Sequence, residues 1–173
     1  MLFNKKTVKS LLIIFLFSYA TLSFRLEQKV EFASQEKAKS LLKCKDVYLK
    51  GLSHFDIQSR YNACGNAVCL DEWLDLQSKS WSKEEIERLD SLVLVVHAKI
   101  DAKGYDISFP DTIWLVRSTG NEEGGSLAYT RMNYIVFGDM ISVVNDSILE
   151  HTIAHELFHI FSRNNPDLQE KLY

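Results

Sequence analysis

EHTIAHELFHIF, residues 150–161, contains the pattern HExxH between His155 and His159. On a helix, residues four apart lie one turn apart on the same face, so both imidazoles can reach one metal ion. Glu156 lies beside that face, where its carboxylate can take a proton from water that the ion activates. If the stretch is helical, it therefore predicts metal-assisted hydrolysis.

The flanking residues predict that the stretch is a helix. Ser147 and Glu150 have the spacing of a capping box, which would begin it. Asn164, Asn165 and Pro166 would end it, because proline disfavours the helical conformation in the residue before it. Apolar residues recur on the side opposite the histidines and can face a core: Leu149, Ile153, Leu157, Ile160 and Phe161. The alternative is an amphipathic helix whose histidines bind no metal.

His151 extends the histidine row by one turn. Residues eight apart on a helix lie about 12 Å apart along its axis, so His151 and His159 cannot readily share one ion. We expect His151 to support a metal ligand or to lie on the surface.

HELFH on a capped helix resembles the zincin metallopeptidases, in which two histidines bind zinc and the glutamate is the general base. The resemblance covers at most the last third of the chain. It implies Zn²⁺ as cofactor, His155 and His159 as metal ligands, Glu156 as the catalytic base, and a peptide or protein as substrate.

The resemblance does not identify the third zinc ligand. A metzincin would continue as HExxHxxGxxH, but Ser162 and Asn165 occupy the glycine and final histidine positions. A gluzincin takes a glutamate from a later helix, and the only carboxylates after His159 are Asp167 and Glu170. The candidates are therefore these two residues, or sequence that this chain lacks.

The end of the chain is typical of the first turns of another helix. Asn165 would cap it and Pro166 would take its first position. Neither a closing glycine nor a complete apolar face follows. We therefore expect a gluzincin-like chain that is short at its C-terminus.

The beginning of the chain predicts an export signal. A basic leader with three lysines precedes the apolar run of residues 11–17, and residues 18–20 offer small side chains for a signal peptidase. We expect residues 1–20 to be a signal peptide, and the mature protein to be secreted or periplasmic. The alternative is an uncleaved membrane anchor, since residues 21–24 prolong the apolar stretch.

Charge gives no indication of nucleic acid as a partner. Removing the three lysines of residues 1–20 from the 20 basic residues leaves 17 against 23 acidic residues, a net charge of −6. Basic side chains and aromatics also form no joint stripe along the sequence.

Export would place three cysteines in an oxidising compartment. Cys64 and Cys69 bracket a loop that a disulfide could close, which leaves Cys44 over. The odd count keeps a different pairing and a free thiol open. Zinc binding is less favoured, because CxxxxC has no matching second pair.

The middle of the chain predicts helix followed by strands. Ser82 and Glu85 form a second capping box, and the apolar period predicts a helix over about residues 83–102. Residues 112–117 and 129–137 are expected strands, separated by a turn at residues 120–125.

The region before residue 80 gives weaker signals. Residues 26–42 suit a surface helix, residues 46–50 a short strand, and residues 70–76 a short helix. His54 and Asp56 are expected to share a loop.

Together these features predict an α+β zincin-like domain over residues 81–173, with a small antiparallel or mixed sheet packed against the HExxH helix. A helical region with the cysteine loop precedes it at residues 21–80. In zincins the strand before the helix is often a sheet edge that pairs with an extended peptide, and the resemblance places this strand at residues 134–137. Glu122 and Glu123 could approach the metal, although a solvated acidic turn is the default expectation.

Two functions follow. The first is an exported zinc-dependent metallopeptidase that hydrolyses peptide bonds with water activated by the metal. The alternative is an inactive or truncated zincin-like domain that acts as a structural or binding module. A carboxylate near both histidines would favour the first, and an empty third position would favour the second.

Overall fold

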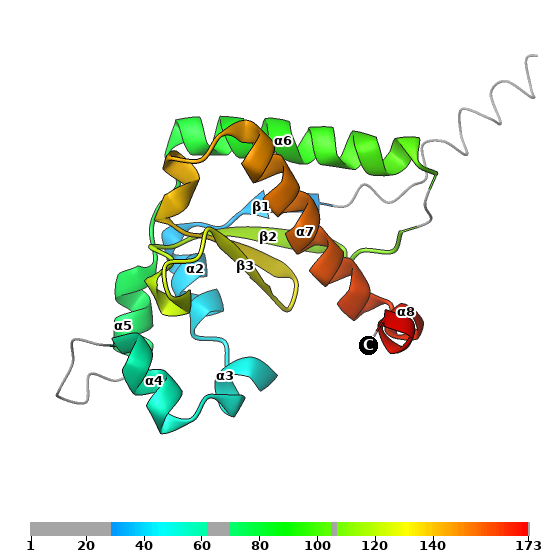
Figure 1. Ribbon diagram of the computed structural model, residues 1–173. Helices are drawn as coiled ribbons and strands as arrows, with labels where there is room; N and C mark the ends of the chain where they lie inside the picture. The colour runs from blue at the N-terminus through cyan, green and yellow to red at the C-terminus, as the bar shows by residue number, and fades with distance from the viewer. Residues whose placement is uncertain (1–28, 62–69, 105–106, 173) are drawn as a thin grey trace, which may run out of the picture.

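The protein has a mixed four-stranded sheet with helices on both faces, which confirms the α+β class (Figure 1). The computed structural model describes residues 29–61, 70–104 and 107–172. The elements follow the chain in this order: β1 (Lys29–Phe32), α2 (Gln35–Leu42), α3 (Val47–Gly51), α4 (His54–Tyr61), α5 (Leu70–Gln77), α6 (Lys83–Ala102), β2 (Thr112–Arg117), η1 (Asn121–Glu123), β3 (Ala128–Arg131), β4 (Tyr134–Phe137), η2 (Asp139–Ser142), α7 (Asp146–Asn164) and α8 (Pro166–Leu172).

The strand order is β1-β2-β4-β3. β1, β2 and β4 run parallel, and β3 runs antiparallel to β4 at one edge. The single strand predicted over residues 129–137 is therefore wrong, because the chain turns back at Met132 and Asn133. Met132 has a φ of 45°. A tight turn usually carries glycine at such a position, and methionine there does not indicate a hairpin.

β1 forms the opposite edge of the sheet, with Lys29 beside Thr112 and Phe32 beside Leu115. The helix predicted over residues 26–42 is therefore wrong for residues 29–32 and right for α2. The Phe32 ring packs against Trp81, with ring centroids 5.4 Å apart. Pairing with β2 and this contact outweigh the weak helical preference of a short polar segment.

Two further expectations before residue 80 are wrong. Residues 46–50 do not form a strand, because Asp46 caps α3 by accepting the Leu49 N–H at 2.9 Å. His54 and Asp56 lie in α4 rather than in a loop. The short helix predicted at residues 70–76 is present as α5.

Of the three cysteines, only Cys44 lies within the described residues. Cys64 and Cys69 lie outside the described residues. Cys44 is half-buried, and its thiol lies 3.7 Å from the Met132 sulfur.

α6 confirms the helix predicted over residues 83–102. Ser82 Oγ accepts the Glu85 N–H at 3.1 Å, and the Glu85 carboxylate accepts the Ser82 N–H at 3.0 Å. These reciprocal bonds complete the predicted capping box.

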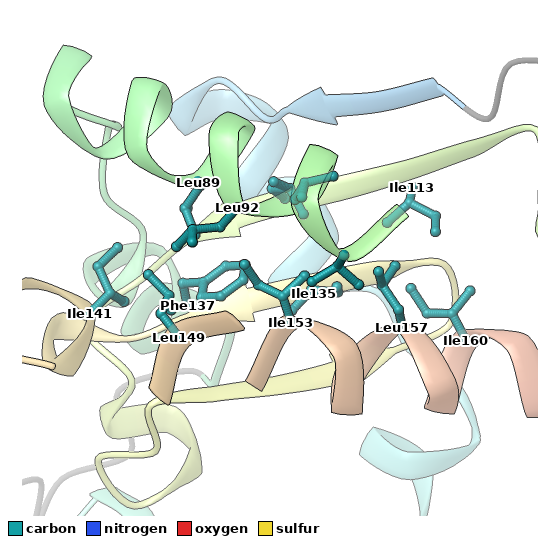
Figure 2. Packing of buried hydrophobic residues seen from close by; sticks show 13 residues of the cluster. Leu89, Leu92, Ile113, Ile135, Phe137, Ile141, Leu149, Ile153, Leu157 and Ile160 are labelled. Atoms are coloured by element: carbon teal, nitrogen blue, oxygen red, sulfur yellow. The ribbon is translucent and has the colours of Figure 1, made fainter. Parts of the chain in front are cut away.

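The main core lies between the sheet and the pair α6 and α7 (Figure 2). From α7 it contains the predicted stripe residues Leu149, Ile153, Leu157 and Ile160, each at most 2% exposed. A second cluster on the other sheet face joins α2 and α5 to β2 and β4.

α7 begins at Asp146 with Asn145 as its cap, so the capping box predicted at Ser147 is wrong. Asn145 Oδ1 accepts the Ile148 N–H at 3.0 Å. Arg88 of α6 fixes this start by donating to the carbonyls of Ile141 and Val144, at 2.7 and 2.6 Å. The cap thus lies two residues earlier, where α6 holds the preceding turn.

Two glycines allow the chain to cross itself at the end of the sheet. A Cβ on Gly138 would collide with the Ser126 carbonyl oxygen and lie 3.0 Å from the Gly120 Cα. Gly120 itself has a φ of 84°, which a side chain would strain. The segment that leads from β2 into β3 therefore depends on the absence of side chains here.

We expect Gly138→Ala to lower the free energy of unfolding by about 1–3 kcal/mol, because backbone atoms must shift to admit the methyl group. Gly51→Ala is the matched control, since a Cβ there meets nothing within 4 Å. Urea unfolding followed by circular dichroism measures both. Equal stability of Gly138→Ala and the unchanged chain would contradict the close approach.

Candidate functional site

α7 brings His155 and His159 together on its outward side. Their Nε2 atoms lie 3.0 Å apart, and the ring planes are nearly perpendicular at 88°. Two nitrogen ligands of a tetrahedral zinc ion, each about 2.0–2.1 Å from the metal, lie about 3.3 Å apart. The side chains therefore already converge as two ligands of one ion do.

The position of Glu156 follows from the helical period. At about 100° per residue, it falls between the histidines and the buried stripe. It is 6% exposed, and its carboxylate accepts a hydrogen bond from the Thr130 hydroxyl of β3. The sheet therefore fixes the orientation of the Glu156 carboxylate, on the residue that directly follows His155 in α7.

Thr130 is the residue that the sequence analysis missed. A single threonine in a predicted strand is ordinary, since β-branched residues favour strands. Only the packing of β3 against α7 brings its hydroxyl to a carboxylate 26 positions later.

An aromatic row lies next to the histidine pair. The Phe158 ring centroid lies 6.4 Å from those of His159 and Phe161, and Phe161 lies 6.1 Å from Phe109.

His97 lies at the far end of this row, 6.2 Å from Phe109. Burial lowers the pKa of His97, and the nearby Asp101 only partly offsets this. Its Nε2 is buried without a hydrogen-bond partner among the described residues.

The third ligand is not found in the described part of the chain. There, no three His, Cys, Asp or Glu side chains are grouped so that they could hold a metal. Asp167 and Glu170 lie on α8 and do not join the histidine pair. His151 is exposed, and its Nδ1 lies 2.7 Å from the Ser147 carbonyl oxygen, so it is tied to its own helix.

Glu122 and Glu123 make contacts within the fold and do not join the histidine pair. Glu122 is 4% exposed, contrary to the expected solvated turn, and accepts hydrogen bonds from Ser118 and Tyr129. Burial and this carboxylate raise the pKa of Tyr129. Glu123 pairs with Arg60 at 2.8 Å.

The open edge of the sheet is β3, so the expectation that residues 134–137 form it is wrong. β4 lies between β2 and β3. The Gly138 N–H donates to the Leu127 carbonyl, so these two residues form a hydrogen-bonded pair. Hydrogen-bonded and non-hydrogen-bonded pairs alternate along an antiparallel ladder. The N–H and C=O groups of Ala128 and Thr130 therefore point away from β4. No backbone hydrogen bond to these two residues from elsewhere is found within residues 29–61, 70–104 and 107–172.

Comparisons with protein-family models, with curated proteins and with solved structures each find no match for this chain. The function is therefore inferred from the geometry of the site.

The predicted signal peptide, residues 1–20, lies outside the described residues. Among the helices that the structure describes, none has the length and apolar character needed to cross a membrane.

We expect the purified protein to bind one Zn²⁺, and His155→Ala and His159→Ala each to abolish binding, because each removes one of two converging nitrogens. His151→Ala, on the same helix, should bind zinc as the unchanged chain does. Isothermal titration calorimetry measures stoichiometry and affinity. Equal zinc binding by all four proteins would show that the pair is not a metal site.

Proposed function

We propose that this protein is an exported, zincin-like metallopeptidase that uses zinc to hydrolyse peptide bonds. One observation carries the proposal: two histidine Nε2 atoms 3.0 Å apart lie on the same helix as a buried glutamate, next to His155 in sequence, that an edge strand holds in place. An amphipathic helix with incidental histidines would require none of these three features.

Each residue has a distinct role in the proposed reaction. His155 and His159 would hold zinc, which supplies Lewis acidity toward water and toward the peptide carbonyl. Glu156 accepts the proton of the attacking water and then returns it to the leaving amine. The Thr130 hydroxyl keeps the Glu156 carboxylate oriented while it carries out both transfers.

The substrate would be an extended peptide. The backbone groups of Ala128 and Thr130 can pair with such a chain by strand addition, in which main-chain hydrogen bonds supply much of the affinity. Because the Thr130 side chain contacts Glu156, a peptide on this edge would lie beside the general base.

A second function is favoured by the ligand count. Catalytic zinc sites normally have three protein ligands, and the described residues provide two that converge. A zincin-like module that binds peptides without cleaving them would fit that count. Tight zinc binding would indicate a third ligand and favour the peptidase, whereas weak binding would favour the module.

We expect Glu156→Gln to abolish peptide hydrolysis while it leaves zinc stoichiometry unchanged, because the amide cannot accept the proton and is not a ligand. Release of a fluorophore from a quenched peptide, with zinc present, measures the reaction. Hydrolysis at an undiminished rate in this variant would refute Glu156 as the base.

We expect Thr130→Val to reduce kcat by about 10- to 100-fold, since hydrogen bonds to charged groups contribute about 1.5–3 kcal/mol. KM and zinc stoichiometry should stay unchanged, because valine preserves the strand and contacts no ligand. Thr130→Ser retains the hydroxyl and should restore most of kcat. If Thr130→Ser is as slow as Thr130→Val, the hydroxyl is not the group that positions Glu156.

A further inference from the structure

A hollow lies beside the open edge of the sheet. Its volume is about 470 Å³, and its walls include Val47 and Tyr48 of α3, Tyr129 and Arg131 of β3, and Met132 of the following turn. We call this cavity the β3 hollow; α3 and β3 are labelled in Figure 1. Its volume is in the range that peptide-sized and drug-sized ligands occupy.

The hollow lies along β3 between α3 and the C-terminal part of α7, since Thr130 of β3 and Arg163 of α7 also line it. Tyr129 packs in the cluster on the α2 and α5 side of the sheet, whereas Thr130 reaches Glu156 on α7. Successive residues of a strand alternate between faces, so Arg131 shares the face of Tyr129.

A peptide paired with β3 would follow the same alternation. Its residue opposite Thr130 would direct its side chain toward α7 and the proposed metal site. The residues on either side of that one would direct theirs toward the α3 side of the hollow, which Tyr129 and Arg131 line. That side of the hollow therefore faces the neighbours of the residue nearest the proposed general base.

The exposed surface of the hollow is mainly apolar and adaptable. Several of the exposed large apolar side chains of the described residues gather here: Val47 is 89% exposed, Tyr48 39% and Met132 50%. Methionine adjusts to different apolar shapes, and tyrosine offers a ring face for an aromatic partner.

Ion pairs hold Asp46, Glu123 and Arg131 of the lining, and Arg163 of α7, which also lines the hollow, likewise interacts within the protein. Asp46 pairs with Arg131 at 2.8 Å, and Glu123 pairs with Arg60 at 2.8 Å. Burial alone would raise the pKa of Asp46, but hydrogen bonds from Arg131 and the Leu49 N–H outweigh it and lower the pKa. A charged guest would compete with these pairs, whereas a neutral one would not.

We infer that the β3 hollow binds an aromatic or long apolar side chain of an extended peptide, at a residue adjacent to the one opposite Thr130. This inference rests on the proposed function, since it assigns the substrate class of the same site. It makes Val47, Tyr48 and Met132 specificity-determining residues of the peptidase.

Peptide binding to the full chain carrying Glu156→Gln tests the inference, because this variant binds without cleavage. The probes are fluorescent peptides that differ only in carrying Phe, Ser, Glu or Lys at alternate positions, and fluorescence anisotropy gives Kd with and without zinc. We expect the Phe peptide to bind about 10-fold or more tightly than the others.

Substitutions in the hollow test whether it causes this preference. Met132→Glu and Val47→Glu should each remove the preference for Phe. Leu94→Glu on α6, where the side chain is 64% exposed and lies outside the hollow, should preserve it. Equal binding of the Phe and Ser peptides, or a preference that survives both hollow substitutions, would overturn the inference.

Cleavage by the unsubstituted chain with zinc separates the two proposals. If that chain cleaves all four peptides at similar rates and no binding preference exists, the hollow inference fails while the peptidase proposal stands. If the Phe preference appears in binding but no peptide is cleaved, the peptidase proposal fails while the hollow remains a peptide-binding site.

Discussion

Burial of the apolar stripe of α7 against the sheet fixes how that helix is rotated, and the candidate site depends on this rotation. Leu149, Ile153, Leu157 and Ile160 are each at most 2% exposed. Truncating one such side chain typically costs about 2–5 kcal/mol, so the helix cannot turn about its axis without losing much of the fold's stability. The histidines are held outward as a consequence.

The same rotation places Glu156 at the border between core and surface. A carboxylate at 6% exposure needs a hydrogen-bond partner, because an unpaired buried charge is strongly unfavourable. Thr130 provides that partner from the edge strand. One hydrogen bond therefore satisfies a buried group of the fold and orients the carboxylate that we propose as the general base.

The edge strand in turn ties the N-terminal helices to the site. Arg131 is 6% exposed and pairs with Asp46, the cap of α3, while it also donates to the Cys44 carbonyl at 2.7 Å. This cluster keeps α3 beside β3 and thereby forms the hollow. A region with no recognisable motif thus shapes the surface on which we expect the substrate to lie.

The sequence alone determined the α+β class, both long helices and the convergence of His155 with His159, because helical periodicity and the four-residue spacing are local properties. It did not determine the hairpin at Met132, the strand β1, the edge position of β3 or the Thr130–Glu156 hydrogen bond. These depend on which segments pair and pack across long separations in the chain, where several arrangements satisfy the same local pattern. Tertiary packing decides between these arrangements, because one face of each element must be buried and the polar groups buried with it must be hydrogen-bonded.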